Sequence, residues 1–374
     1  MAKLSPGVKL LRSLARAARS QHKMVSRLLA AATPAPPTPP RKPRRPLRAQ
    51  PALPANAGVP MSGQWLTARH PVRARPGAHM DYWLYLPQSR STTSLPRGWP
   101  LIVMLHGCHQ SAAEFAEGTR MNRLAEARGY AVLYPEQPSS AHPQRCWRWY
   151  DRATQQGGGD TAVLADLIDR LCGRHPLDRC RIYACGLSAG AGMAAVLALN
   201  HPELIAAVGL HSSPVFGAGH SAIGALRVMR HGAPMQADAA IGGVLERRSL
   251  LPLAGPMPPM PAILIQGAQD QVVHPVNQQH LASQWMRLNG LTPGPASRVT
   301  AKPAGRGGRH HAHEIHDYLV GRKLLLRVAR IADLGHAWSG GDPTLKFNAK
   351  AGPDASRMVL DFFGRHRRPV SAYR

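Results

Sequence analysis

From about residue 64 onward, short apolar runs alternate with longer amphipathic segments. The apolar runs predict buried strands at Leu101–Leu105, Ala131–Tyr134, Arg181–Cys185, Leu204–Leu210, Ala262–Ile265 and Leu324–Ile331. Helical periodicity falls between several of them, at Ala112–Ala127, Thr161–Leu171 and Ala189–Leu199. This alternation predicts an α/β domain over residues 64–374, with a mostly parallel sheet and helices on both faces. Functional groups in such sheets lie just past the carboxyl ends of the strands.

The first 63 residues follow a different pattern. Residues 1–32 place apolar side chains such as Leu11 and Leu14 at helical spacing, with arginines on another face. They predict a basic amphipathic helix or, equally, a disordered arm. Residues 33–63 are rich in Pro and Arg and predict a stiff, extended linker. Charges interrupt the apolar positions of residues 1–32, which disfavours a cleavable secretion signal.

Composition and charge narrow the function classes. The hydrophobic fraction of 44% suffices for a folded core, and no apolar run is long enough for a membrane-spanning helix. The net charge is +27, and residues 1–50 contain twelve Lys and Arg but no Asp or Glu. This basic arm predicts contact with an anionic or hydrophobic surface. It lacks interleaved aromatic residues, so no specific nucleic acid is expected as a partner.

The predicted strand Arg181–Cys185 runs into a reactive motif. Gly186-Leu187-Ser188-Ala189-Gly190 matches G-x-S-x-G between a strand and a helix, the pattern of a nucleophile elbow. Such a turn presents the serine hydroxyl above the sheet, and its glycines avoid collisions with neighbouring backbone. The helix that follows directs its N-terminal N–H groups toward developing negative charge. Ser188 is therefore the predicted nucleophile.

Two later strand ends provide partners for this serine. An elbow requires an acid and then a histidine further along the chain. Asp270 follows the strand Ala262–Ile265, and His336 follows Leu324–Ile331 in a loop of small residues. Either residue alone could be ordinary, a turn carboxylate or one of 19 histidines. The order Ser188, Asp270, His336, with each residue past a strand end, predicts a catalytic triad.

Upstream, the strand Leu101–Leu105 ends in His106-Gly107-Cys108. A loop after an early strand supplies the second N–H group of an oxyanion hole in elbow enzymes. We assign the two donors to the backbone N–H groups of Ala189 and Cys108, with a plain glycine turn as the alternative at Cys108. We assign His106 and Trp338 to substrate binding, because aromatic walls suit acyl chains. Burial in the core is the alternative for Trp338.

Cysteines and histidines outside the triad were weighed for metal and disulfide chemistry. The five cysteines show no CxxC spacing, which disfavours a zinc site. Cys108 and Cys146 follow two strands expected to be neighbours, so their pairing in an oxidising compartment is a hypothesis, although connectivity does not follow from sequence. A histidine cluster is expected in an exposed insertion and matches no standard ligand spacing: His310, His311, His313 and His316. We therefore expect no metal and no cofactor.

Several segments also carry a joint resemblance. They are His106-Gly107-Cys108, Tyr134–Gln137, Cys146–Trp149, Gly186–Gly190, Gly335–Gly341 and Gly352–Ser356. Together they resemble the poly(3-hydroxybutyrate) depolymerase-type esterases of the α/β-hydrolase superfamily, over about residues 80–366. The resemblance implies a serine esterase acting on short hydroxyacid polyesters, with relatives acting on feruloyl or acetyl esters of plant polysaccharides. It carries the nucleophile, acid and base to Ser188, Asp270 and His336.

The predicted function is carboxylester hydrolysis, with an ester or polyester as the partner. Two alternatives stay open: a non-catalytic protein tethered to a surface by its basic arm, and a peptidase of the same fold. The resemblance implies an extracellular location, whereas the lack of a clear secretion signal leaves a cytoplasmic, granule-associated one. Extracellular depolymerases often add a polymer-binding domain, and the chain ends at Arg374 without room for one after the catalytic domain. A soluble oligomer or small ester is thus as open as a dense polymer.

Overall fold

The computed structural model describes residues 62–88, 97–251 and 255–369, and the statements below concern these residues. The predicted arm (1–32) and nearly all of the predicted linker (33–63) lie outside them. The described residues from 64 onward lie within the range predicted for the α/β domain.

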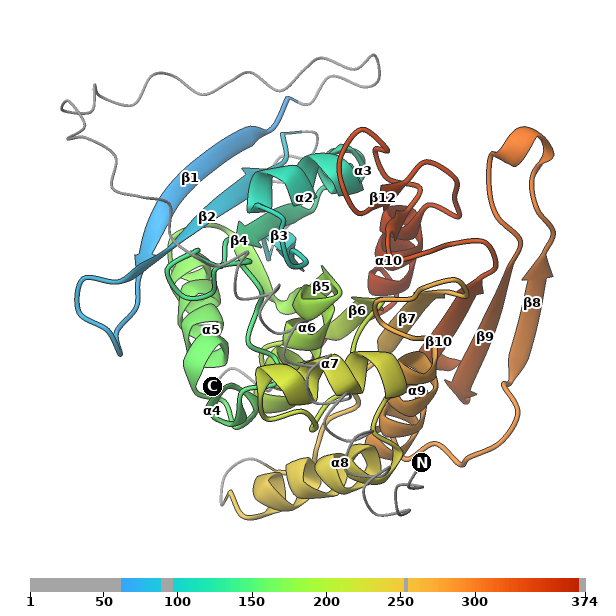
Figure 1. Ribbon diagram of the computed structural model, residues 1–374. Helices are drawn as coiled ribbons and strands as arrows, with labels where there is room; N and C mark the ends of the chain where they lie inside the picture. The colour runs from blue at the N-terminus through green and yellow to red at the C-terminus, as the bar shows by residue number, and fades with distance from the viewer. Residues whose placement is uncertain (1–61, 89–96, 252–254, 370–374) are drawn as a thin grey trace, which may run out of the picture. The chain divides into compact units, whose positions relative to one another are not determined.

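A ten-stranded sheet runs through this domain (Figure 1). Its strands are β1 (Gln64–Pro71), β2 (His79–Leu86), β3 (Trp99–Leu105), β4 (Ala131–Pro135), β5 (Leu177–Leu187), β6 (Ala207–His211), β7 (Ala262–Gly267), β8 (Arg298–Lys302), β9 (His313–Val320) and β10 (Lys323–Ile331). The order across the sheet is β1-β2-β4-β3-β5-β6-β7-β10-β9-β8. Strands β4, β3, β5, β6, β7 and β10 are parallel to their neighbours within this set. The outer pairs, β1–β2 and β9–β8, join the sheet antiparallel. The sheet is mostly parallel, as predicted.

Helices cover both faces of the sheet (Figure 1). They are α2 (Ala112–Thr119), α3 (Met121–Arg128), α4 (Arg152–Gln155), α5 (Gly159–Cys172), α6 (Ala189–Asn200), α7 (Ala222–His231), α8 (Pro234–Ser249), α9 (Val276–Leu288) and α10 (Ala355–Phe363). Alternate side chains of β3 enter two separate apolar clusters: Leu101 and Val103 face one, and Ile102 faces the other. The first cluster includes side chains of α5, α6 and α9, and the second includes those of α2, α3 and α10. The parallel strands are therefore buried on both faces, which explains their uninterrupted apolar runs.

The predicted strands are all present, with shifted ends. The strand predicted from Leu204 begins only at Ala207, because Leu204 donates its N–H to His201 in a turn. The helix predicted over Ala112–Ala127 is two helices, since Arg120 takes a left-handed φ of 55° between α2 and α3. A capping box formed by Ser111 and Glu114 begins the first of them.

The location predicted for the histidine cluster was wrong. We expected an exposed insertion, but His313 and His316 lie within β9, where they pair with residues of β10. This antiparallel strand is only partly buried, so its pattern is mixed and the apolar-run criterion does not detect it. Among the described residues, no three His, Cys, Asp or Glu side chains are placed to hold a metal ion.

The length and polarity of the helices bear on membrane insertion. Within the described ranges, every helix is too short or too polar to cross a bilayer.

Candidate active site

The predicted nucleophile lies on a sharp turn at the carboxyl end of the sheet. Strand β5 ends at Leu187, helix α6 begins at Ala189, and Ser188 between them has φ 58° and ψ −122°. A Cβ at Gly186 would lie 2.4 Å from the carbonyl carbon of Gly190, and a Cβ at Gly190 would lie 2.0 Å from the carbonyl oxygen of Leu105. Both glycines are required because backbone packs where a side chain would stand. The turn has the strained geometry expected of a nucleophile elbow.

The predicted acid and base are in direct contact. Asp270 follows β7, His336 follows β10, and the His336 Nδ1–H donates to Asp270 Oδ2 over 2.9 Å. The other oxygen, Oδ1, accepts from the backbone N–H groups of Val272 (3.0 Å) and Val273 (2.9 Å). With Nδ1 engaged, the Nε2 atom of His336 is free to take a proton.

The charge state of Asp270 follows from these partners. Burial would by itself raise the pKa of this carboxyl group, but the hydrogen bond and charge of His336, with bonds from Val273 and Ser212, outweigh it. The net result is a pKa below the ordinary value of an aspartate. Asp270 is therefore ionised at neutral pH and can stabilise an imidazolium at His336.

Ser188 and His336 line one cavity of about 300 Å³. Its wall combines residues of the Cys108 loop with residues including Trp149, Tyr150, Leu226, Met229 and Phe347. The Ser188 hydroxyl and His336 are both described and are not hydrogen-bonded to each other in this structure. Such bonds are often long before substrate binds, so the shared cavity is the relevant observation.

Cavities of greater volume lie elsewhere among the described residues. One, of about 580 Å³, is lined by Arg97, Asp178 and residues near Arg365. Another, of about 510 Å³, lies beneath the loop between β1 and β2 and is lined by mixed charges such as Arg148 and Asp166. A third, of about 460 Å³, is lined by residues including His310, His313 and Asp354. None of these three is lined by a residue of the predicted triad, so volume alone does not identify the site.

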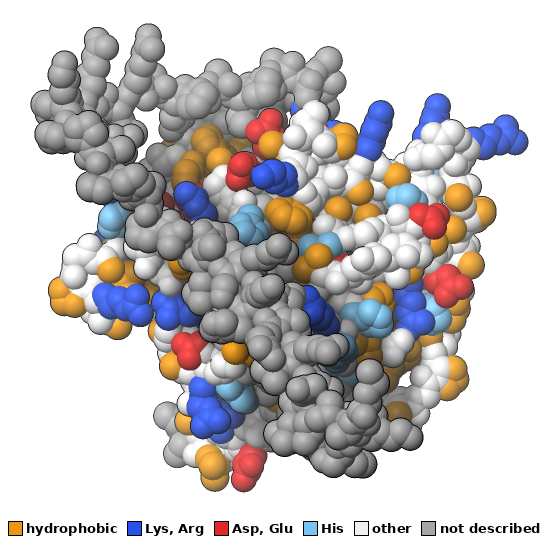
Figure 2. Space-filling model, viewed as in Figure 1, with side chains coloured by type: hydrophobic (Ala, Val, Ile, Leu, Met, Phe, Trp, Pro, Cys, Tyr) orange, Lys and Arg blue, Asp and Glu red, His pale blue; other side chains and the backbone are white. Residues whose placement is uncertain are grey.

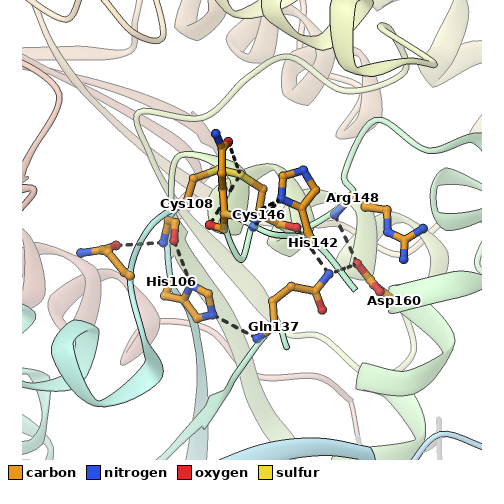
Figure 3. Close-up of a disulfide and its surroundings, with 10 residues drawn as sticks. His106, Cys108, Gln137, His142, Cys146, Arg148 and Asp160 are labelled. Atoms are coloured by element: carbon orange, nitrogen blue, oxygen red, sulfur yellow. Dashed lines mark hydrogen bonds between the residues drawn. A yellow bond between two sulfur atoms is a disulfide. The ribbon is translucent and has the colours of Figure 1, made fainter. Parts of the chain in front are cut away.

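The loop after β3 carries Cys108, the second predicted oxyanion donor. Cys108 is bonded to Cys146 in a disulfide, which confirms the predicted pairing (Figure 3). Both cysteines line the cavity that contains Ser188. Among the described residues, the backbone N–H groups of Cys108 and Ala189 have no hydrogen-bond acceptor, so both are available to a ligand. Gln110 steadies the loop by accepting the Gly107 N–H at 2.9 Å.

The placement of His106 corrects its assignment to substrate binding. Its side chain is completely buried, with Nδ1 2.8 Å from the Gly107 carbonyl and Nε2 accepting the Gln137 N–H at 3.1 Å (Figure 3). The ring points into the protein and does not line the cavity. Burial lowers its pKa to about 4, so the ring is neutral at pH 7. His106 joins the loop after β3 to the loop after β4.

The assignment of Trp338 to substrate binding is also wrong. Its side chain is fully buried and absent from the cavity wall, and its indole N–H donates to the Ser356 hydroxyl over 3.1 Å. One face of the ring stacks on His211, and Phe115 meets it edge-on. Burial in the core, the alternative weighed from sequence, is the correct interpretation. The aromatic residues Trp149, Tyr150 and Phe347 line the cavity instead.

Sequence reasoning missed two groups around the triad. The cavity wall formed by α7, including Leu226 and Met229, has an ordinary amphipathic pattern with no motif. His211 ends β6 and Ser212 follows it directly, and a search of every parallel strand end would have found them.

Comparison with known proteins was decisive for the family. The sequence family described as esterase PHB depolymerase matches residues 80–306. The chain belongs to this family. Poly(3-hydroxyalkanoate) depolymerase C of Paucimonas lemoignei is 28% identical over 247 residues, 65% of this chain and 56% of that protein. Feruloyl esterase B of Thermothelomyces thermophilus is 27% identical over 218 residues, 57% of this chain and 72% of that protein.

The fold comparison agrees with this family. An acetyl xylan esterase from Aspergillus awamori superposes with a TM-score of 0.60 at 19% identity, covering 81% of this chain and 99% of that structure. The chain thus has the α/β-hydrolase fold, as predicted. It spans only 56% of the length of the Paucimonas relative, so the activity of this depolymerase-family chain is treated below as a proposal.

Proposed function

We propose that the protein is a serine carboxylester hydrolase. The observation that carries the proposal is Ser188, on a strained turn, sharing a cavity with His336 while His336 donates to Asp270. These are the spatial relations of a nucleophile, a base and an orienting acid. Membership of an esterase family supports the same reaction class.

The reaction would proceed through an acyl-enzyme. Ser188 Oγ attacks the ester carbonyl as His336 Nε2 takes its proton, and the negative charge on the carbonyl oxygen is met by the Cys108 and Ala189 N–H groups. His336 then gives the proton to the departing alcohol. The same imidazole then takes a proton from water, which attacks the acyl group. The imidazolium returns this proton to Ser188 Oγ as the acyl–oxygen bond breaks and the acid leaves. Asp270 holds the imidazole in the required tautomer throughout.

Short hydroxyacid esters of the polyhydroxybutyrate type are the proposed substrates. The cavity wall is largely apolar, with Leu226, Met229 and Phe347 available to an acyl chain. A related depolymerase acts, by its name, on poly(3-hydroxyalkanoate). Feruloyl and acetyl esters of polysaccharides are the second candidate class, because relatives of similar identity bear those names.

A single assay tests the activity, and a panel then tests the substrate. A stoichiometric burst of p-nitrophenol from a short-chain ester, absent in Ser188→Ala, is expected of an acyl-enzyme mechanism. A protein that only binds surfaces would give no burst, and a peptidase would cleave matched amides as well as esters. Relative kcat/KM over hydroxybutyrate oligomers, feruloyl esters and acetylated xylan then identifies the preferred class; preference for either polysaccharide ester would overturn the polyester assignment.

We propose further that residues 1–63 contact a surface and that the protein works in an oxidising compartment. The first proposal is supported by the run of twelve basic residues without an acid in residues 1–50. The second is supported by the Cys108–Cys146 disulfide, because disulfides persist mainly in extracellular and other oxidising environments.

A further inference from the structure

His211 lies at the point where three functional segments meet. It is the last residue of β6, and its side chain is only 1% exposed. Its carbonyl oxygen accepts the Ser188 N–H over 3.0 Å, which ties it to the nucleophile turn. Its Nε2 atom accepts the N–H of Ser339 at 3.3 Å, which ties it to the loop that carries His336.

The hydrogen bond from Ser339 also determines the tautomer of this ring. Because Nε2 accepts an N–H, a neutral imidazole must carry its hydrogen on Nδ1. Nδ1 lies 3.1 Å from the Ser212 hydroxyl oxygen, so the ring donates to Ser212. The ring is neutral at pH 7, since burial lowers its pKa to about 3. Trp338 stacks on the ring with centroids 5.1 Å apart and holds its plane.

Ser212 completes the connection to Asp270. Its oxygen accepts from His211, which leaves the hydroxyl hydrogen to be donated, and Ser212 is one of the groups that stabilise the charged form of Asp270. Ser212 is fully buried and has φ 49°, a left-handed conformation that is costly for a non-glycine residue. Such strain concentrates where a side chain must be held in one place. Its own N–H is bonded to the Ile265 carbonyl of β7, which fixes it beside the strand that leads to Asp270.

We propose that His211 and Ser212 are positioning residues, which orient Asp270 toward His336 through the relay Ser339 N–H, His211, Ser212 and Asp270. Neither side chain lines the cavity, so neither touches the substrate. Gln266, which donates to Asp270 Oδ2 at 3.0 Å, braces the same carboxylate from its own strand. The relay couples the orientation of Asp270 to the loop that carries His336. The inference rests on the proposed esterase function.

Ser212→Ala tests the relay with little disturbance of volume. Loss of the Ser212 hydroxyl, which stabilises the charged form of Asp270, predicts a fall in kcat of about ten-fold, with KM unchanged because the cavity is untouched. Ser213→Ala is the matched control: Ser213 is the next residue and equally buried, but its hydroxyl donates to the Pro214 carbonyl. The control is expected to keep the wild-type kcat, and thermal unfolding of both variants checks that the fold is retained.

Double variants separate positioning from structural damage. In an Asp270→Asn background, Ser212→Ala should cause no further loss, since its effect acts through the Asp270 carboxylate. His211→Gln should lower kcat about as much as Ser212→Ala, and the double variant no more than either, because both break one relay. The low-field proton resonance of the His336–Asp270 hydrogen bond should move in Ser212→Ala and stay in place in Ser213→Ala.

Failure of this inference is distinct from failure of the proposed function. If Ser188→Ala is inactive while Ser212→Ala keeps the wild-type kcat and resonance, the relay is overturned and the esterase assignment stands. A loss in Ser212→Ala that persists in full in the Asp270→Asn background overturns the relay too. Turnover that survives Ser188→Ala overturns the proposed function itself.

Discussion

At the scale of single residues, the proposed reaction depends on side chains that lie on strained backbone. Ser188 and Ser212 are both non-glycine residues with positive φ, at 58° and 49°. Both follow a parallel strand directly, at the edge of the sheet where ligands bind in this class of fold. At Ser188 the neighbouring backbone packs closely, as the contacts of Gly186 and Gly190 show.

Replacing the triad residues tests their assigned roles. Ser188→Ala and His336→Ala should each lower kcat by about 10⁴-fold or more while leaving the fold intact. The double variant should be scarcely slower than either single one, because nucleophile and base act as a unit. Steady-state kinetics on a soluble ester, with circular dichroism as the folding control, measure this. Retention of more than about a tenth of the activity in Ser188→Ala would contradict the assignment.

The stability of the protein in acid also depends on single residues. Among them, His106 is the clearest source of acid sensitivity. Its pKa is about 4 in the folded protein and about 6.5 when unfolded. As the pH falls through 6.5, His106 becomes protonated in the unfolded chain but stays neutral in the folded protein. The free energy of unfolding therefore falls. By pH 4 this single group has lowered the free energy of unfolding by about 3 kcal/mol. His106→Gln, whose amide can still accept the Gln137 N–H, should therefore lose less stability between pH 7 and pH 4.

Urea unfolding at the two pH values measures the difference. His211 and His366, also buried and with lowered pKa values, preserve part of the acid dependence in the variant. The exposed His231→Gln serves as the control and should follow the wild type. An equal loss of stability in wild type and His106→Gln would show that His106 is not a source of the acid sensitivity.

At the scale of elements, the site is a set of loops tied together at the carboxyl ends of parallel strands. The loop after β3 is joined to the segment after β4 by the Cys108–Cys146 disulfide and by His106, which bonds to Gln137 (Figure 3). The loop of His336 is joined to β6 through Ser339 and His211. Each tie fixes a group that the proposed reaction uses.

Removing the disulfide tests the first of these ties. Cys108→Ser/Cys146→Ser opens a link between residues 38 apart in sequence and should lower the free energy of unfolding by about 3 kcal/mol. The Cys108 N–H would lose its fixed position, so kcat should fall by about ten-fold, less than the loss of a whole oxyanion donor. Activity and urea unfolding measure both effects. The control is Cys172→Ser, a thiol outside the disulfide, and equal kinetics in the two variants would exclude the disulfide from the site.

Some of these elements are predictable from sequence and others are not, for physical reasons. Strands such as β5 and β7 are buried on both faces and read as apolar runs, so their ends and the residues after them could be predicted. Strands β1, β8 and β9 have exposed or half-buried residues along much of their length and left no such signal. The direction of a side chain is also hidden: His106 and Trp338 adjoin the site in sequence, yet their rings turn into the core. The interactions of His211 with the distant residues Ser188 and Ser339 exist only in the folded chain.

At the scale of the whole molecule, charge is spread unevenly along the sequence. Of the net charge of +27, residues 1–50 contribute +12, and the difference of +15 belongs to residues 51–374. Figure 2 shows Lys and Arg side chains scattered over the described surface of one face, with Asp and Glu among them. The body of the protein will therefore attract anionic surfaces to some degree without the N-terminal segment, and a test of that segment must subtract this background.

Deleting residues 1–60 tests whether the N-terminal segment binds a surface, as we propose. The deletion removes no residue of the cavity or the triad, so kcat and KM on a soluble ester should stay at the full-length values. Binding to anionic vesicles or polyester granules should weaken, because each basic residue near such a surface contributes about 1 kcal/mol at most. The difference should be largest at low salt and shrink as salt screens it. The matched control is the full chain with Arg41, Lys42, Arg44 and Arg45 changed to Gln, which removes charge and keeps length. Co-sedimentation over a salt series measures all three proteins; if they bind alike at low salt, the basic segment has no part in surface binding.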